Sequence, residues 1–477
     1  MRPGLASRKS TNVSIAAAPF GGTFCYEGEK VPGVAPAHRP RFSFSSSSSD
    51  ARALRDLPDA MADASRVSTD MYGNTYPEGG PRAYLCVLGG FCGLMAAMGT
   101  LNTIGAYQTY LSTHQLRDSA ASSVGWIFGI YVFLAFFGGL QIGPIFDAVG
   151  PRWLVLAGSV CLLLTHLLLG ICTAYWHFVV VFGVLGGLGT SLIFTPAFAA
   201  VGHWFLRRRG HMTGLAAVGG SLGGIVFPLA LQALAPRVGF TWATRFVALV
   251  DVVLLAVANL CIRVRLPPKP ISRANVLPDL RIMGEPVFAF TTLGVFFYEW
   301  GLFVPLAYLS SYALAHGVPP ALAYQLLAVL NAGSCLGRYL PGLAADRLGR
   351  YNAMVATTAL GLVATLALWL PAADHVALIV AFALVFGFAS GAGISLTPVC
   401  VGQLCRVDNY GRYYATCYTL VSFGSLTGIP IAGLLLGACG GRYWGVVVFA
   451  SMSYAASLAA LVTARGIGTG WKLCVVY

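Results

Sequence analysis

The chain has 477 residues, of which 57% are hydrophobic and only 10% are charged, whereas a soluble globular domain carries about 25% charged residues. A soluble protein this apolar could not cover its surface, so the composition argues against a water-soluble enzyme and indicates a bilayer as the solvent. The formal net charge is +13, but no basic helix interleaved with stacking aromatic residues accompanies it, which argues against nucleic acid as a partner.

Residues 1–80 differ in composition from the rest of the chain. They are rich in Pro, Ser and Gly, including the run Ser45–Ser49, and show no apolar periodicity. This composition predicts a disordered cytoplasmic tail, and no apolar run of signal-peptide length is present. Basic residues and serines precede the first acidic residue, Glu27, so an organelle transit peptide is the second interpretation. We favour the plasma membrane.

From Ala83 onward, apolar stretches of about 20 residues alternate with short polar loops, which is typical of membrane-spanning helices. The pattern predicts an all-α membrane protein with twelve transmembrane helices. Their expected positions are 83–106, 122–144, 153–174, 176–200, 211–233, 241–262, 285–310, 320–342, 353–371, 375–400, 412–437 and 443–464.

The longest interior polar stretch, residues 263–284, separates six predicted helices from six. We therefore expect an N-terminal bundle over 81–262, a cytoplasmic linker over 263–284, a C-terminal bundle over 285–465 and a cytoplasmic tail over 466–477. Basic residues concentrate in the loops on the side of the tail, as in Arg207–Arg209, which predicts that both termini are cytoplasmic.

The two predicted halves repeat one another, as expected of a transporter built from duplicated bundles. The segment from Gly143 to Arg152 matches the segment from Gly342 to Arg350 at an offset of 199 positions. At an offset of 202, Gly99 matches Gly301, Tyr110 matches Tyr312, Thr195-Pro196 matches Thr397-Pro398, and Pro228 matches Pro430.

The repeated segment resembles the signature loop of the major facilitator superfamily, which implies two six-helix bundles that work by alternating access. Glycines permit a tight turn, and a loop aspartate can face a helix N-terminus or an arginine, so these residues are expected to close the cytoplasmic side in one state. An ordinary loop with a capping aspartate is the plainer interpretation. The expected gating residues are Gly143, Asp147, Gly150, Arg152, Gly342, Asp346, Arg347, Gly349 and Arg350.

A closer resemblance is to the monocarboxylate-porter branch, particularly its fungal members. It is carried by the segment Pro77–Tyr84 before the first helix, Asn102–Gln108, Gly337–Gly342 and Gly470–Leu473. Members carry monocarboxylates with protons, riboflavin or secondary metabolites, so the resemblance leaves the substrate open. It covers about residues 77–477.

In the proton-coupled lactate carriers of that branch, a lysine of helix 1 and an Asp/Arg pair of helix 8 serve substrate and proton. Arg338 matches the arginine, but Asn102 stands at the position of the lysine and Ser334 at that of the aspartate. These departures argue against classical proton–lactate symport. The candidate substrate-binding residues are Arg338, Asn102 and three aromatic residues that would line an apolar pocket, Tyr107, Phe303 and Tyr308.

Four ionisable residues fall within apolar segments, where each is costly and marks a functional candidate: Arg245, Asp251, Glu299 and Arg338. Glu299, near the middle of helix 7, is the candidate for proton coupling; a structural hydrogen bond or ion pair is the alternative. Arg338 could bind a carboxylate, extend to the interface or pair with Glu299. For Arg245 and Asp251 we expect structural roles.

Other chemistry is not indicated. The spacing of the twelve cysteines does not suit a metal site and indicates free thiols. The histidines are scattered along the sequence, and no phosphate-binding glycine loop is present. We therefore expect no cofactor, no metal and no enzymatic activity. The expected partners are a small-molecule solute, the bilayer and protons.

Together these features predict secondary active transport of a small organic solute, a monocarboxylate or related metabolite, by alternating access. Export of a fungal secondary metabolite is the alternative within transport. A non-transporting nutrient sensor is a third interpretation, although the tail of about 80 residues is short for one. The Gly-x-x-x-Gly spacings, such as Gly333/Gly337 and Gly387/Gly391, predict close helix packing rather than ligand contact.

Overall fold

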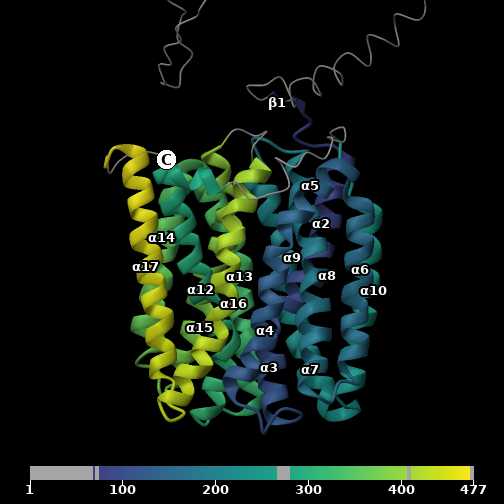
Figure 1. Ribbon diagram of the computed structural model, residues 1–477, viewed down its shortest axis with the longest axis vertical. Helices are drawn as coiled ribbons and strands as arrows, with labels where there is room; N and C mark the ends of the chain where they lie inside the picture. Colours follow the sequence, from purple (N-terminus) through teal and green to yellow (C-terminus); the bar gives the residue numbers. More distant parts are fainter. Residues whose placement is uncertain (1–67, 70–74, 266–279, 406–409, 473–477) are drawn as a thin grey trace, which may run out of the picture. The chain divides into compact units, whose positions relative to one another are not determined.

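The computed structural model describes residues 68–69, 75–265, 280–405 and 410–472 (Figure 1). The predicted tail up to residue 67, the middle of the predicted linker at 266–279 and residues 473–477 lie outside the described residues. The described part of the chain is almost entirely helical, as predicted.

The first half consists of the following helices, in chain order. They are α2 (Pro81–Asn102), α3 (Ile104–Thr113), α4 (Ala121–Phe137), α5 (Gly139–Val149), α6 (Pro151–Leu169), α7 (Tyr175–Phe178), the π-helical turn η1 (Val179–Gly186), α8 (Gly187–Gly202), α9 (Arg209–Val238) and α10 (Phe240–Cys261). The first predicted span is α2 with α3, and the fourth is α7, η1 and α8.

The second half begins with a 3-10 turn and continues with long helices. They are η2 (Leu280–Gly284), α12 (Pro286–Ala315), α13 (Pro320–Leu348), α14 (Arg350–Val363), the π-helical turn η3 (Ala364–Trp369), α15 (Val376–Gln403), α16 (Tyr410–Ala438) and α17 (Trp444–Thr469). Several helices exceed their predicted length: α13 ends at Leu348 rather than at 342.

Among the described residues, eleven helices are long and apolar enough to cross a membrane. They correspond to eleven of the twelve predicted segments. The remaining segment forms α13, which has 29 residues but carries Gln325, Asn331 and Arg338, and these polar side chains lower its hydropathy below that of the other helices. The count of twelve spans therefore stays a prediction, whereas the multi-pass character of the chain does not depend on it.

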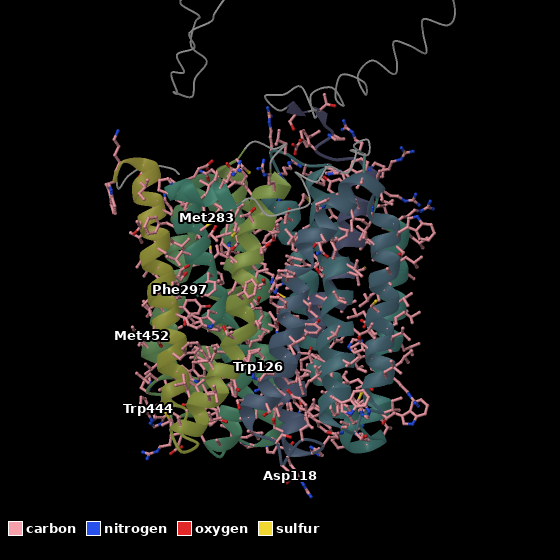
Figure 2. The ribbon with its side chains drawn as sticks, viewed as in Figure 1. Asp118, Trp126, Met283, Phe297, Trp444 and Met452 are labelled. Carbon is pink, nitrogen blue, oxygen red and sulfur yellow. The ribbon has the colours of Figure 1, made fainter. Side chains whose placement is uncertain are left out.

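Apolar side chains point outward from the helices as well as inward. On α17, Trp444 is 57% exposed and Met452 is 65% exposed, and Figure 2 places both at the outer edge. Exposed apolar side chains of this size on most helices would be unfavourable in water, but they match a surface covered by lipid.

The helices of each half pack mainly on one another, and three helix pairs make the most extensive contacts between the halves. Helix α2 packs on α8, α9 and α10, while α13 packs on α15 and α12 packs on α17. Between the halves, α4 packs on α16, α9 on α13 and α3 on α12. In Figure 1 the two groups lie side by side, and β1 and the end of α17 lie at the same end of the helices. We call this the β1 end.

Glycines set the closest helix contact of the second half, between α13 and α15. A Cβ at Gly333 or Gly337 would overlap a backbone carbonyl of α15, and a Cβ at Gly387 or Gly391 would overlap a backbone carbonyl of α13. The predicted packing role of these two Gly-x-x-x-Gly pairs is therefore confirmed, because only glycine lets the two backbones approach this closely.

The sequence repeat reappears at equivalent positions of α3 and α12. Thr109 Oγ1 lies 3.0 Å from Ser311 Oγ, and these residues are 202 positions apart. Five residues later in each half, His114 Nδ1 contacts the carbonyl of Tyr110 at 3.1 Å and His316 Nδ1 contacts the carbonyl of Tyr312 at 2.9 Å. Matched residues of the two halves therefore occupy matched environments, and one matched pair meets at the boundary between the halves.

The end of the predicted tail is ordered, which corrects the boundary at residue 80. Strand β1 (Ser68–Thr69) pairs with β2 (Thr75–Tyr76) in an antiparallel ribbon, and the residues that follow lead directly into α2. The prediction of disorder is wrong for residues 75–80 because specific contacts to distant loops hold them. Proximity along the chain cannot reveal such contacts.

Glu78 makes the central contact of this ordered segment. Its carboxylate accepts hydrogen bonds from Ser68 Oγ at 2.5 Å and from the backbone amides of Leu206, Arg207 and Arg208 at 2.8, 2.7 and 3.2 Å. These amides precede α9, so Glu78 caps a helix that starts about 130 positions later. The same contacts hold its backbone at φ 52°, a strained value for a residue other than glycine.

The pKa of Glu78 reflects both its burial and this cap. Burial raises the pKa, but the hydrogen bonds from Ser68 and from the three amides outweigh burial, and the net shift is downward from 4.5. Because the folded-state pKa is depressed, the carboxylate stabilises the fold above about pH 4.5, and this contribution is lost as the pH falls through the lower folded value.

We expect Glu78→Gln to lower the free energy of unfolding by about 1–3 kcal/mol at neutral pH, because hydrogen bonds to a charged acceptor are lost. The difference from wild type should shrink below about pH 4.5. Thermal unfolding of the purified protein at several pH values measures both effects. Glu285→Gln is the matched control, since this exposed carboxylate accepts from Tyr413 Oη. Equal losses in the two variants would contradict the capping role.

Candidate functional site

The boundary between α9 and α13 carries the densest set of buried polar side chains that join the two halves. It contains Arg338, Ser334 and Asn331 of α13, Ser221 of α9 and Asn102 at the end of α2, all between 0% and 3% exposed. Residues 331, 334 and 338 follow helical spacing, so they share one face of α13, and that face meets α9.

Arg338 is a charged side chain buried inside the helices. It is 1% exposed, and Nη1 donates a 2.6 Å hydrogen bond to the carbonyl of Ala217 on α9. Nε has no hydrogen-bond partner, and no carboxylate among the described residues lies within ion-pair distance of the guanidinium. A buried, unpaired charge costs several kcal/mol, so the side chain is held ready for an anionic partner or for water.

Asn102 lies beside α9, the helix whose Ala217 carbonyl accepts a hydrogen bond from Arg338. A substrate site that contains both residues requires this proximity. Its Nδ2 donates to the carbonyl of Gly220 at 3.0 Å, and a Cβ at Gly220 would lie 2.8 Å from Arg338 Nη1. Arg338 and Asn102 are therefore brought together across one glycine. A larger residue at position 220 would have to displace the guanidinium.

Asn331, which sequence reasoning missed, completes the polar row. Its Nδ2 donates to the carbonyls of Gly224 at 3.1 Å and Leu327 at 2.9 Å. In a regular helix the carbonyl of residue 224 would accept from the amide of residue 228, but residue 228 is Pro and has no amide hydrogen. Asn331 of the second half thus provides the donor that Pro228 removes from the first half.

Ser334 occupies the position where the resemblance expects an aspartate. Ser221 Oγ donates to Ser334 Oγ at 3.1 Å across the boundary between the halves. The replacement therefore turns a position expected to carry charge into a neutral hydrogen bond, and it leaves Arg338 without a carboxylate one turn away on its own helix.

Glu299 lies on α12, in the same half of the chain as Arg338. It is 1% exposed, and neither carboxylate oxygen has a hydrogen-bond partner in the described part of the chain. Its charge acts electrostatically on Cys417 and Tyr418 of α16. One turn along α12, the ring of Phe303 lies 6.1 Å from that of Phe136 on α4.

Phe303 thus lies among aromatic side chains of three helices that span both halves. The ring of Phe136 is also 5.4 Å from that of Tyr418. A lone buried carboxylate beside aromatic rings offers a solute an apolar surface and one titratable group.

The other two predicted aromatic residues lie elsewhere. Tyr107 packs within the first half, with its ring 5.2 Å from Phe182 and 6.4 Å from Phe240. Tyr308 Oη donates to the carbonyl of Ile429 at 3.2 Å, linking α12 to α16. The structure therefore joins Arg338 with Asn102 and Glu299 with Phe303, but it brings neither Tyr107 nor Tyr308 into contact with Arg338.

Two alternatives for Arg338 are wrong. The side chain does not reach the interface, because α13 continues for ten residues beyond it and keeps it inside the helices. It also forms no ion pair with Glu299, since neither carboxylate oxygen of Glu299 has a partner among the described residues.

The predicted gating segments are helix junctions rather than loops. Gly150 connects α5 to α6 with φ 83°, and Gly349 connects α13 to α14 with φ 95°. Both are left-handed conformations that favour glycine. Arg152 and Arg347 are exposed beside these turns, and Arg350 begins α14. Gly143 and Asp147 lie within α5, Gly342 and Asp346 within α13; the two aspartate side chains lie outside the described residues.

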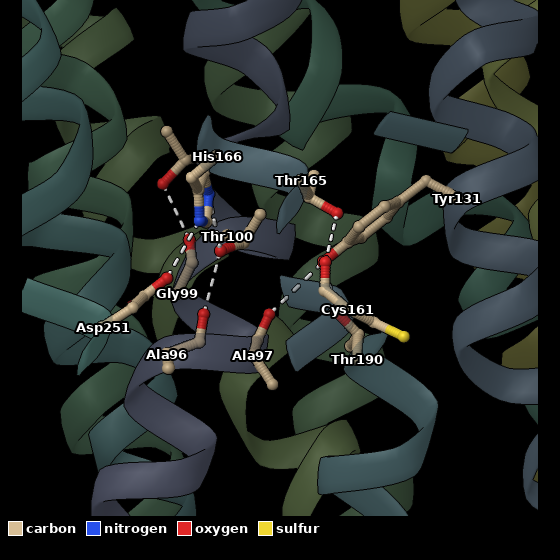
Figure 3. Close-up of polar contacts among 11 residues, drawn as sticks. Ala96, Ala97, Gly99, Thr100, Tyr131, Cys161, Thr165, His166, Thr190 and Asp251 are labelled. Carbon is tan, nitrogen blue, oxygen red and sulfur yellow. Dashed lines mark hydrogen bonds and ion pairs between the residues drawn. The ribbon is translucent and has the colours of Figure 1, made fainter. Parts of the chain in front are cut away.

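A second buried pair within the first half was also missed from the sequence. His166 Nδ1 of α6 lies 2.9 Å from Asp251 Oδ2 of α10, and both side chains are fully buried (Figure 3). Sequence reasoning treated the histidines as scattered because the 85 positions between these residues hide their contact. Arg245 does not join them, since its guanidinium lies 4.9 Å from the ring centroid of Trp242.

The described residues contain no group of three or more His, Cys, Asp or Glu that could hold a metal ion. The ten cysteines that the structure describes are free thiols. The chemistry available at the boundary is therefore that of charge, hydrogen bonds and apolar contact.

Comparison with known proteins relates the whole helical region to one family. The model of the major facilitator superfamily matches residues 87–384 and 290–467. The chain is 35% identical to the MFS transporter asaE of Aspergillus flavus over 84% of this chain and 90% of that protein. It is 30% identical to the riboflavin transporter MCH5 of Saccharomyces cerevisiae, with 83% and 81% coverage. It is also 34% identical to the aspyridones efflux protein apdF of Emericella nidulans, with 77% and 74% coverage.

The hydrogen bond between Asn331 and the carbonyl of Gly224 leads to a testable prediction about stability. Asn331→Ala should lower the free energy of unfolding by about 1–3 kcal/mol, because it leaves a buried carbonyl unpaired. In a Pro228→Ala background the helix supplies its own amide donor, so the same substitution should cost about 1 kcal/mol less. Thermal or denaturant unfolding of the four proteins measures this coupling.

Pro236→Ala is the matched control background, because Pro236 also lies within α9 but is four residues from Gln232 rather than from Gly224. The cost of Asn331→Ala should be unchanged there. An equal cost in all three backgrounds would show that the carbonyl of Gly224 does not depend on Asn331.

Proposed function

The chain belongs to the major facilitator superfamily, whose members are transporters and not enzymes, and from this premise we propose that it carries a small organic anion across the membrane by alternating access. It is an integral, multi-pass membrane protein that handles a small-molecule solute. We propose further that the solute carries a carboxylate and that its transport is coupled to protons.

One observation carries the proposal: Arg338 is buried at the boundary between the halves without a carboxylate partner. A guanidinium forms two parallel hydrogen bonds with a carboxylate, so a carboxylate-bearing solute would supply the missing charge. Asn102 lies across Gly220 from it and adds an amide. Alternating access requires contacts that form and break between the halves, and the bond from Arg338 to Ala217 joins them.

We place the proton at Glu299. A buried carboxyl group without hydrogen-bond partners is tolerated in its neutral form but not as an isolated anion. Proton binding and release at this residue would then accompany its exposure to each side of the membrane. Phe303, Phe136 and Tyr418 supply the apolar contacts for the remainder of the solute.

Assignment to the monocarboxylate-porter-like branch is part of this proposal. The support is the segment Pro77–Tyr84, in which Glu78 caps α9, together with Arg338. The neutral residues Asn102 and Ser334 favour a solute other than lactate. We also propose that the two halves rock as bundles over 81–262 and 285–465, that Gly150 and Gly349 mark the gates, and that both termini are cytoplasmic in the plasma membrane.

Export of a secondary metabolite is the second candidate, because one relative is named an efflux protein for aspyridones and the aromatic cluster around Phe136 suits a larger apolar solute. Direction separates the two. Uptake into intact transporter-deficient yeast supports import, whereas accumulation in inside-out vesicles without cellular uptake supports export.

Arg338→Ala should reduce transport of the solute about 10- to 100-fold, because a charge-assisted pair with the carboxylate is worth about 1.5–3 kcal/mol at most and each 1.4 kcal/mol is about tenfold. Arg338→Lys should retain part of the rate, since it keeps the charge but not the planar fork. The measurement is uptake of labelled pyruvate, other labelled monocarboxylates and riboflavin into transporter-deficient yeast at pH 5 and pH 7. Arg245→Ala is the control arginine. Wild-type rates in Arg338→Ala would show that the residue is structural.

Glu299→Gln should separate exchange from accumulation. The amide keeps the size of the side chain but cannot bind a proton, so solute exchange should continue while accumulation driven by an acid-outside gradient should fall at least about tenfold. Reconstituted vesicles, with and without an imposed pH gradient, measure the two activities. Undiminished gradient-driven accumulation in Glu299→Gln would remove the residue from the coupling mechanism.

A further inference from the structure

We propose that His166 and Asp251 form a proton-binding site within the first half, separate from Glu299. The His166 Nδ1 and Asp251 Oδ2 atoms are 2.9 Å apart, and both side chains are 0% exposed. The pair joins α6 to α10, and Figure 3 shows Thr100 of α2 beside the imidazole ring, whose Nε2 it contacts. Three helices of one half thus meet at a single titratable ring.

The contact between the Thr100 hydroxyl and His166 Nε2 depends on whether the imidazole ring is protonated. Thr100 Oγ1 donates its one hydrogen to the carbonyl of Ala96 at 2.9 Å, and it lies 3.4 Å from His166 Nε2. A protonated imidazole donates from both nitrogens, so Nδ1–H points to Asp251 while Nε2–H points to a lone pair of the hydroxyl. These hydrogen bonds are compatible with one another.

Loss of the proton changes this pattern. If Nδ1–H remains directed at Asp251, neutral Nε2 presents a lone pair to the hydroxyl oxygen. The Thr100 hydrogen must then turn from Ala96 to Nε2 to restore a hydrogen bond. Proton binding therefore adds one proton to the ring and reorients one hydroxyl of α2, with no other bond formed or broken.

The charge of the site changes as well. Asp251 with neutral His166 carries one negative charge, and with protonated His166 it carries none. Burial penalises the charged state, so the balance between the states depends on how much water reaches the pair. A conformational change that admits water to the pair would therefore change its protonation state.

Few other groups face the pair. The charge of Asp251 acts on Tyr107 of α3 and Tyr131 of α4. Tyr131 Oη lies 2.6 Å from Thr190 Oγ1, whereas Tyr107 Oη has no hydrogen-bond partner in the described part of the chain. His166 Nδ1 and both Asp251 oxygens also lack a partner with hydrogen-bond geometry there, so the two side chains lie at ion-pair distance without a directed hydrogen bond.

Along α2, the site is two residues from the solute site proposed above. Thr100 lies two residues before Asn102, where α2 ends before α3 begins at Ile104. A proton-dependent hydroxyl therefore lies within one turn of an amide that we assign to the solute. The link to transport depends on the proposed function, but proton binding itself does not.

Nitrogen NMR of the protein in nanodiscs, with its histidines labelled with ¹⁵N and no solute added, tests the site with protons as the ligand. The resonances of His166 are those lost in His166→Gln. Between pH 4 and pH 9 we expect His166 to change from two protonated ring nitrogens to one. An unchanged protonation state over that range would overturn the proposal, and would leave the results for Arg338 unaffected.

Substitutions at two threonines test the role of the hydroxyl. Thr100→Val removes the acceptor for Nε2–H, so the ¹⁵N resonance of His166 Nε2 in the protonated ring should move from its wild-type position. Thr165→Val is the matched control, because this buried neighbour donates to the carbonyl of Cys161 on its own helix, and it should leave that resonance unchanged. Equal shifts in both variants, or none in Thr100→Val, would overturn the assignment of Thr100.

Discussion

Inside a bilayer, every polar group must find its partner within the protein, because no water is available to replace a missing one. The boundary between the two halves depends on this constraint. Pro228 removes one backbone donor from α9, and Asn331 of α13 supplies a substitute. A hydrogen bond that is normally internal to a helix thus becomes a contact between the halves, and it must be broken or replaced when they move.

The same constraint distinguishes the ionisable residues of the two halves. In the first half, His166 and Asp251 lie at ion-pair distance from one another, on α6 and α10. In the second half, Arg338 contacts α9 at the boundary and Glu299 is buried on α12, and neither has an ionic partner among the described residues. The paired charges suit a site that binds a proton, whereas the unpaired charges suit a site that a solute and a proton complete. The two halves therefore repeat the arrangement of helices but not the buried ionisable residues.

Close helix contacts at glycines explain how the buried side chain of Arg338 is held in one orientation. Helices α13 and α15 approach until a methyl group would overlap a backbone carbonyl, so the face of α13 that carries Arg338 has a fixed orientation. Gly220 and Gly224 of α9 leave space for Arg338 and for Asn331. Close packing on one side of α13 and polar contacts on the other together position the arginine, which neither set would do alone.

The sequence by itself determined the class of the protein, eleven of its membrane segments and the repeat, and it singled out Arg338, Asn102 and Glu299 as candidate site residues. Apolar length, charge asymmetry and residue type are properties that a linear pattern carries. Only the tertiary structure decided which of these residues meet. Tyr107 faces the interior of its own half, Glu78 caps a helix more than a hundred positions away, and His166 finds Asp251 on another helix. Such contacts depend on the rotation and depth of packed helices, which hydropathy leaves unspecified because helices that are apolar on every face have no pattern to orient them.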